Sequence, residues 1–259
     1  MKHFYYFLIL LSVILFSCSD KYVVKGSSTE NILNGKVAYI KHANNGRYEL
    51  LDSCEVLHGK FEMSGMVDSV MFVTLFMGEY NCIPFVLEYG DINISFVDSS
   101  IKIEGTPLND KLYSFFCSRD SLMLQLAELP SIRNMMILDG YDMNHVRSEI
   151  ERSEHELLRA MHKLEKQFVI DNFDNVLGVT WFMELCNDAT LRSGFPATTP
   201  LIEEIYISAP EHFKSHPKIY DFMKRVDDAM FGNMPQGKMT EDVMPSNREV
   251  DPNVHNANY

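Results

Sequence analysis

The sequence predicts an α+β fold, in which an antiparallel β-sandwich N-terminal domain is followed by an α-helical region. Two observations support it: short β-branched and aromatic runs before residue 107, and helical spacing of apolar residues after it. The change of period marks the boundary between the two parts. We therefore expect a signal peptide at 1–17, a tether at 18–21, a β-sandwich at 22–106, a helical region at 107–231 and a disordered tail at 232–259.

The N-terminus has the parts of a bacterial export signal. Met1–His3 is basic, Phe4–Phe16 is an apolar run broken only by Ser12, and the small residue Ser17 precedes Cys18. The apolar run is shorter than the roughly 20 residues that span a bilayer, so a cleaved signal fits better than a transmembrane helix. We expect the segment before Cys18 to be removed.

The stretch Leu15-Phe16-Ser17-Cys18 resembles a lipobox, in which the cysteine is lipidated and becomes the mature N-terminus. A plain signal peptide and a simple apolar anchor are the alternatives. Stable attachment to a membrane needs more than one acyl chain, and a lipidated bacterial cysteine carries at least two. We expect a cell-envelope protein that is lipid-anchored through Cys18, on the periplasmic or outer-membrane side, with its body in water.

The chain is acidic. Its formal net charge is −13 at pH 7, and loss of Lys2 with the signal makes it −14. Nucleic acids and anionic lipid surfaces attract basic patches, so this balance argues against a nucleic-acid partner and against electrostatic binding to lipid. The glycines do not cluster into a phosphate-binding loop, and no motif indicates a cofactor.

The first part of the body has strand signals punctuated by turns. The runs are short, β-branched or aromatic, and partly alternating. They are Lys36–Ile40, Phe61–Met63, Val70–Phe76, Phe85–Leu87 and Ile92–Phe96. Turn residues such as Asn44-Asn45-Gly46 and His58-Gly59 separate them, with no helical pattern between, so an antiparallel sandwich is expected.

After Pro107 the apolar residues recur at helical spacing. The pattern predicts a helix over Leu108–Leu129 that Pro130 ends, because proline lacks a backbone N–H and clashes with the preceding turn. Four further helices are expected at Asp142–Asp171, Val176–Asn187, Thr199–Ser208 and His216–Met230. From Gly232 onward the apolar period is lost, which indicates disorder.

Three stretches together resemble a known family. They are Leu51–Gly65, with its Gly59-Lys60-Phe61-Glu62-Met63 core; Leu87–Asp110, with Tyr89-Gly90-Asp91; and Phe168–Gly178, with Asn172-Phe173-Asp174-Asn175. The family is the N-terminal domain of unknown function of lipoproteins from Bacteroides-type bacteria, which usually precedes a TlpA/ResA-like thioredoxin domain. The resemblance covers about Tyr22–Phe231. It implies a fold and a redox context, not an activity.

The motif residues have structural explanations. Four glycines are expected where strands reverse and positive φ is needed. They are Gly59, Gly65, Gly90 and Gly105. Phe61 and Met63 should face one side of the sheet, and Thr106 or Asn109 would cap the first helix. The thioredoxin domain of the relatives is expected to be absent, because Trp181 has no CxxC beside it and no cysteine follows Cys186.

Four cysteines follow Cys18 and are far apart in the sequence. They are Cys54, Cys82, Cys117 and Cys186. In an oxidising compartment an even set can form disulfides, whereas their apolar neighbours favour buried free thiols. Cys82 lies in a polar loop and is the best candidate for a reactive thiol. A zinc site is disfavoured because zinc ligands usually come in close pairs.

Two sets of histidines have spacings that would suit a metal. Glu151, His155 and His162 share a helical face, but charged neighbours indicate a solvated surface. His212 and His216 are four residues apart, although prolines on both sides argue against one continuous helix. We therefore expect no metal site and no catalytic residues.

The sequence leads to three functional hypotheses. The first is a non-catalytic, membrane-anchored lipoprotein that binds a protein or a small ligand. The second is an accessory partner of a separate thioredoxin-like thiol-disulfide oxidoreductase, which rests on the family context alone. The third is an enzyme with a site that no motif reveals, for which a deep pocket with convergent polar groups would be the structural sign.

Overall fold

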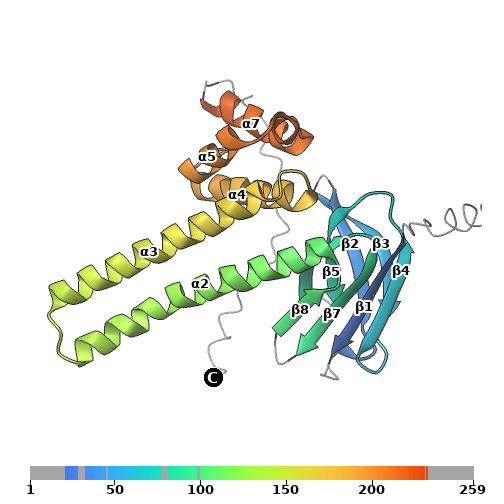
Figure 1. The fold of residues 1–259 in the computed structure, drawn as a ribbon, viewed down its shortest axis with the longest axis horizontal. Coiled ribbons are helices and arrows are strands. Elements are labelled where there is room, and N and C mark those ends of the chain that lie inside the picture. Colours follow the sequence, from blue (N-terminus) through green and yellow to red (C-terminus); the bar gives the residue numbers. More distant parts are fainter. Residues whose placement is uncertain are drawn as a thin grey trace, which may run out of the picture.

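The computed structural model describes residues 21–28, 33–44, 46–77, 81–97, 100–230 and 232. The expected signal peptide, Cys18 and the expected tail beyond Gly232 lie outside these residues. Two four-stranded sheets precede a set of helices (Figure 1), which confirms the predicted α+β fold class. Among the described helices, none combines the length and the apolar content needed to cross a bilayer.

The sandwich-like part consists of eight strands. They are β1 (Lys21–Ser28), β2 (Val37–Asn44), β3 (Arg47–Glu55), β4 (Lys60–Met66), β5 (Met71–Met77), β6 (Asn81–Leu87), β7 (Gly90–Val97) and β8 (Ser100–Glu104). One sheet has the order β4-β1-β7-β8 and the other β3-β2-β5-β6. All neighbours are antiparallel except β1 and β7, which pair in parallel. This pair departs from the expected antiparallel sheet, and the long connection between the two strands permits it.

The two sheets share one apolar core. Val24 and Ile94 from one sheet and Ile40, Leu75 and Phe85 from the other are all buried in a single cluster. The alternation of side chains along each strand explains this arrangement, because every second residue points to the same face. In β4 the burial pattern alternates as predicted, with Phe61 and Met63 buried and Lys60 and Glu62 exposed.

Gly65 has a different role from the one predicted. It lies inside β4, not at a strand reversal, and its backbone does not have positive φ. A Cβ at this position would lie 2.8 Å from the hydroxyl oxygen of Tyr22 on the neighbouring strand. Glycine therefore makes room for the Tyr22 ring, whose hydroxyl donates to Asp52 over 3.1 Å. The predicted positive φ is confirmed at Gly59, Gly90 and Gly105, with values of 72°, 116° and 107°.

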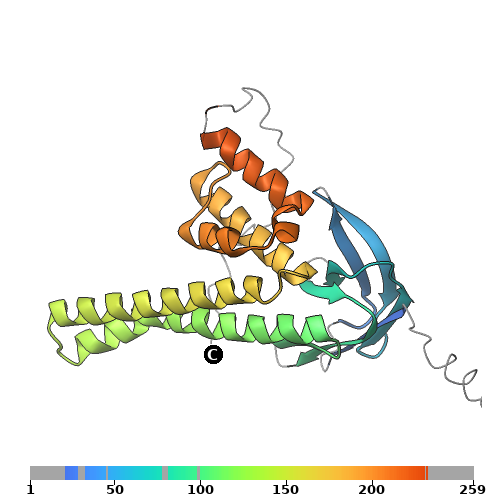
Figure 2. The ribbon, with the colours of Figure 1, turned by 45° about the horizontal axis from the view of Figure 1, so that its top comes forward.

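The first long helix, α2 (Pro107–Leu138), corrects the sequence prediction. The helix does not end at Pro130 but continues through it for two further turns. A proline inside a helix costs about 3 kcal/mol because it removes a hydrogen bond and crowds the preceding turn. Here α3 (Met143–Ile170) runs antiparallel beside α2 (Figure 2), and Leu129, next to the proline, is buried. Packing along the partner helix offsets the local cost.

The α2–α3 hairpin projects from the sandwich (Figures 1 and 2). Its turn contains Gly140 with φ 84°. Asp142 then caps α3, since its carboxylate accepts the N–H groups of Asn144 and His145. The predicted range of this helix, Asp142–Asp171, is confirmed to within its cap residues.

The remaining helices form a second body beside the sandwich. They are α4 (Val176–Ser193), α5 (Pro200–Ser208), α6 (Glu211–Lys214) and α7 (Pro217–Met230). The α4 helix is six residues longer than predicted and ends at Gly194, whose φ is 79°. The short α6 was not predicted. Phe182, Phe213 and Phe222 lie in the apolar cluster at the centre of this body.

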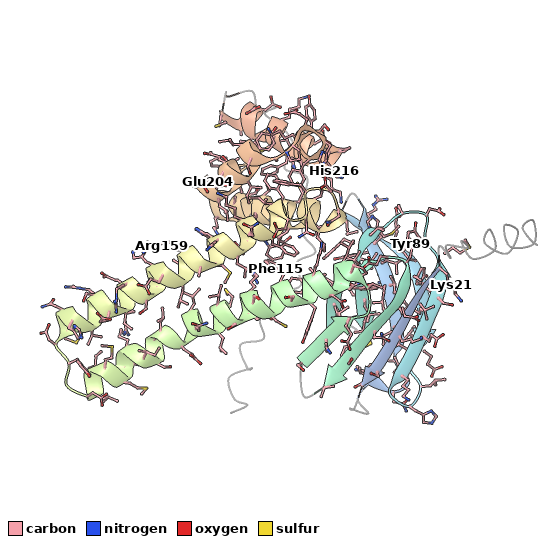
Figure 3. All side chains as sticks on the ribbon, viewed as in Figure 1. Lys21, Tyr89, Phe115, Arg159, Glu204 and His216 are labelled. Carbon is pink, nitrogen blue, oxygen red and sulfur yellow. The ribbon has the colours of Figure 1, made fainter. Side chains whose placement is uncertain are left out.

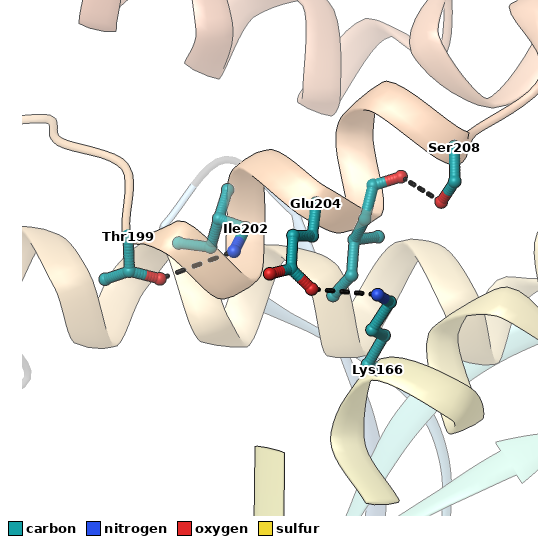
Figure 4. A network of polar contacts seen from close by, with 6 residues as sticks. Lys166, Thr199, Ile202, Glu204 and Ser208 are labelled. Atoms are coloured by element: carbon teal, nitrogen blue, oxygen red, sulfur yellow. Dashed lines mark hydrogen bonds and ion pairs between the residues drawn. The ribbon is translucent and has the colours of Figure 1, made fainter. Parts of the chain in front are cut away.

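The start of α5 has its own cap and one ion pair to α3 (Figure 4). Lys166 Nζ lies 2.8 Å from Glu204 Oε2, and Thr199 Oγ1 accepts the Ile202 N–H at 3.4 Å. Thr199 thereby caps the first turn of α5 and satisfies one of its free N–H groups. The predicted start of this helix is confirmed.

Aromatic rings join α2, α3 and α4. Phe115 of α2 stacks on Phe168 of α3 at a centroid distance of 3.9 Å, and the Trp181 ring of α4 meets Phe115 edge-on at 4.6 Å. Such aromatic pairs add about 0.5–1.5 kcal/mol each beyond their burial. Figure 3 shows Phe115 at this junction, where the hairpin meets the rest of the molecule.

Candidate functional site

A cleft of about 650 Å³ lies between the sandwich and the helical body. Its sandwich side is formed by β2 and by the start of β5, and its helical side by α4, α6 and the beginning of α7. His216, just before α7, lies where the helical body approaches the sandwich (Figure 3). The volume falls within the range of about 300–1,000 Å³ that is typical of small-ligand sites.

The walls of the cleft are largely apolar. Val70, Met71 and Phe72 contribute from the sandwich side, and Val179 and Met183 from α4. These residues come from segments that are about 100 residues apart in the sequence. Burying apolar ligand surface against such walls is worth about 25 cal/mol per Å².

His42 presents a hydrogen-bond acceptor at the cleft. Its Nδ1 lies 3.0 Å from the backbone oxygen of Phe72, and both residues line the cleft. A carbonyl oxygen only accepts, so Nδ1 carries the hydrogen in this contact. In the neutral ring the other nitrogen, Nε2, then keeps its lone pair. The backbone of β5 thereby fixes the tautomer of His42.

His212 and Asp174 are in polar contact at the rim. His212 Nε2 of α6 lies 2.8 Å from Asp174 Oδ1, in the turn between α3 and α4. Both side chains are largely exposed, at 57% and 89%. The edge-on contact of Phe173 with Phe213, at 4.7 Å between centroids, joins the same two segments.

His216 lines the cleft with a half-buried ring. Its Nδ1 is buried and has no hydrogen-bond partner among the described residues. Burial lowers the pKa of His216, and the nearby Lys218 cation lowers it further. The neutral imidazole therefore prevails at neutral pH, with one ring nitrogen as a donor and the other as an acceptor.

Glu184 adds an acidic group on the α4 side of the cleft. Partial desolvation raises the pKa of Glu184, and the neighbouring Asp188 raises it further, although the side chain still reaches solvent. The site thus combines apolar walls with three imidazoles and two carboxylates. This combination suits a ligand with an apolar body and a few hydrogen-bonding groups.

The cleft brings together residues that the sequence analysis treated separately. His212 and His216 do not share one helix, as predicted, but both line the cleft together with His42. Glu151, His155 and His162 lie on the exposed face of α3, away from it. Within the described ranges, no three His, Cys, Asp or Glu side chains are placed to hold a metal ion.

The four described cysteines are free and lie outside the cleft. The interpretation as buried thiols is right for Cys186, where burial raises the pKa to about 12. It is wrong for Cys82 and Cys117, which are exposed, while Cys54 is half-buried and has a raised pKa through burial. Cys82 pairs with Phe76 at one edge of a sheet and Cys117 lies on the outer face of α2, so neither is covered by a second layer.

The fold and the cleft define a two-part α+β protein with a ligand-sized site at the junction of its parts. Residues 22–112 match the family model described as Domain of unknown function (DUF4369). The match spans the sandwich and ends in the second turn of α2. Searches of curated proteins and of solved structures gave no match.

Proposed function

We propose that this protein is a lipid-anchored envelope protein that binds a small ligand in the cleft and does not transform it. The cleft itself carries the proposal. Apolar walls from the sandwich and α4 line an open cleft of about 650 Å³, and His42, His216 and Glu184 provide hydrogen-bonding groups. A ligand with an apolar body and polar ends satisfies both features.

Binding accounts for these groups better than catalysis. The described cysteines lie outside the cleft, so no thiol nucleophile is held beside one of its imidazoles. The His42 ring is oriented by its contact with the backbone oxygen of Phe72. A ring held in this way selects among ligands by hydrogen-bond geometry.

The anchor is supported by the N-terminal sequence. The short apolar run and the Ser17-Cys18 pair are the features that a lipoprotein signal requires. Cells grown with radiolabelled palmitate should incorporate label into the native chain and none into a Cys18→Ser variant. A native chain without label would disprove the anchor.

Filling the cleft tests the binding site. We choose Thr180→Trp, which places an indole in the cleft, and Ile207→Trp as the matched control on the exposed face of α5. The probe is anilinonaphthalene sulfonate, an apolar anion whose fluorescence rises in apolar sites. We expect Thr180→Trp to weaken probe binding about tenfold, a loss of about 1.4 kcal/mol in binding free energy. Ile207→Trp should leave probe binding unchanged. Equal binding by both variants would place the probe elsewhere and count against the cleft.

An accessory role beside a separate thioredoxin-like oxidoreductase is the second candidate. It is favoured by the exposed free thiols of Cys82 and Cys117. A thiolate at either position would attack the disulfide of an oxidised partner, form a mixed disulfide and release the partner's second sulfur as a thiolate. Acid trapping of cells should then capture a mixed disulfide that Cys82→Ser or Cys117→Ser removes. Capture of none would exclude this role.

A further inference from the structure

The described chain begins very close to the proposed anchor. Only Ser19 and Asp20 lie between Cys18 and Lys21, the first residue of β1. An extended chain spans at most about 3.6 Å per residue, so the two Cα atoms of Cys18 and Lys21 are within about 11 Å of one another. The headgroup layer of one leaflet is about 5–7 Å thick. With a lipid on Cys18, the start of β1 must therefore lie at the membrane surface.

Strand pairing identifies the residues that share this end of the sandwich. Lys21 is opposite Met66, the last residue of β4, and Tyr22 is opposite Gly90, which follows Tyr89. We name Lys21, Met66 and Tyr89 the anchor end. Figure 3 shows Lys21 and Tyr89 on the side of the molecule opposite the turn of the α2–α3 hairpin.

The side chains of the anchor end suit the surface of a bilayer. Met66 is 77% exposed and Tyr89 is 38% exposed, although both carry large apolar groups. Tyrosine favours the interface between headgroups and acyl chains, because its ring is apolar and its hydroxyl is polar. The Lys21 ammonium attracts lipid phosphates.

The charges around the anchor end do not drive this contact. Asp91, next to Gly90, is paired with Lys25 Nζ at 2.8 Å. Asp68, two residues after Met66, is exposed, and Asp20 precedes Lys21 in the sequence, so these two acids outweigh the charge of Lys21. The local charge is therefore slightly negative, and electrostatic attraction does not hold the anchor end to lipid. Contact with lipid then depends on Met66 and Tyr89 and on the anchor that holds them there.

We propose that the anchor end packs against the lipid bilayer, so that the α2–α3 hairpin points away from the membrane. The inference rests on the proposed lipidation of Cys18. A helix rises about 1.5 Å per residue, so the 32 residues of α2 carry the hairpin turn about 48 Å along the helix axis. Tyr141, in that turn, would lie far from the lipid.

Fluorescence quenching by lipid tests the orientation. The acylated full-length chain is reconstituted into vesicles of phosphatidylethanolamine and phosphatidylglycerol with brominated acyl chains, which quench tryptophan on contact. Tyr89→Trp reports on the anchor end, and Tyr141→Trp is the matched exposed tyrosine at the hairpin turn. The native chain, whose single tryptophan is Trp181, sets the baseline.

After subtraction of the Trp181 fluorescence of the native chain, we expect brominated lipid to reduce the fluorescence of Tyr89→Trp roughly twofold. The fluorescence of Tyr141→Trp should not fall, because only side chains within the interface reach the acyl chains. Equal quenching of both variants, or quenching of Tyr141→Trp alone, would overturn the orientation.

A synthetic anchor separates this proposal from the anchoring itself. In a chain that starts at Cys18, with the exposed Cys82 and Cys117 changed to serine, a maleimide phospholipid couples Cys18 to the vesicle. If the native chain carries no acyl group, the proposed function loses its anchor. The lipid–protein conjugate still shows whether a tether at this position turns the anchor end toward the bilayer.

Discussion

Glu88 Oε1 lies 2.8 Å from the backbone nitrogen of Leu108 and accepts its N–H. The carboxylate at the end of β6 thus caps the first turn of α2, a role that the sequence suggested for Thr106 or Asn109. Thr106 occupies the N-cap position but makes no capping hydrogen bond through its side chain. The negative charge also interacts favourably with the positive end of the helix.

Loss of this cap should destabilise the junction of the sandwich and the hairpin. Glu88 is 7% exposed, and its oxygen also accepts the Asn109 N–H at 3.2 Å. We expect Glu88→Ala to lower the free energy of unfolding by about 1–2 kcal/mol in urea denaturation. Glu88→Gln keeps an acceptor oxygen and should lose less. Equal losses for both variants would show that the charge, rather than the acceptor, stabilises the helix.

Asn109 should be the most sensitive polar residue of the junction. Its Oδ1 accepts the Val86 N–H at 2.9 Å, and its Nδ2 donates to the Val86 oxygen at 2.7 Å. Asn109→Ala leaves both backbone groups of Val86 buried without partners, at about 1–3 kcal/mol for each group. The exposed Asn134 on the same helix is the matched control, and Asn134→Ala should change stability by less than about 0.5 kcal/mol. Thermal or urea unfolding distinguishes the two.

The cap of α5 should matter more than the nearby ion pair (Figure 4). Thr199→Ala removes the acceptor for the Ile202 N–H and should cost about 1 kcal/mol. Lys166 and Glu204 are 37% and 60% exposed, so water and salt screen their attraction. A double-mutant cycle with Lys166→Ala and Glu204→Ala should give a coupling smaller than the loss at Thr199, and smaller still in high salt. A coupling that salt leaves unchanged would contradict this view.

His216 should make stability fall in mild acid. Burial holds the pKa of His216 below its ordinary value of 6.5. As pH drops below 6.5, the unfolded chain takes up a proton that the folded chain does not, so the folded state loses stability until its own pKa is passed. Unfolding measured between pH 7.5 and about 5 should show a smaller slope for His216→Asn, which cannot take up that proton. An unchanged slope for His216→Asn would show that other titrating groups cause the loss of stability in acid.

The cysteines should react in the order of their exposure. A Cys18→Ser chain, treated with Ellman's reagent at pH 8, should show fast reaction of the exposed Cys82 and Cys117 and slower reaction of Cys54. Cys186 should react only after unfolding, since it is buried and its pKa is raised to about 12. Rapid reaction of Cys186 in the native chain would mean that the helical body opens readily.

Local patterns were sufficient to predict most helices and the alternation within strands. Asp142 and Thr199 preceded apolar periods and do cap α3 and α5, because a cap depends on residues within one turn. The prediction that α2 ends at Pro130 was wrong because the outcome there depends on residues that are distant in the sequence. The local cost of the proline is offset by packing of α2 against α3.

The candidate site was likewise only partly predictable from the sequence. The prolines on both sides of His212 and His216 correctly argued against a single helix, although the spacing of the two histidines would suit one. The sequence carried no signal that His42, about 170 residues away, would line the same cleft. The role of Asp174, a polar residue in a short turn, was equally unpredictable from the sequence, because its partner His212 lies on another element.

The sequence alone determined the fold class, most of the helices, and the capping residues of α3 and α5, because these depend on neighbours along the chain. Only the tertiary structure decided that Glu88 caps α2, that α2 runs through Pro130 and that three histidines meet at one cleft. Each of these outcomes depends on the relative placement of the sandwich and the helices. That placement is set by burial of apolar surface between them, which has no period and no fixed spacing in the sequence.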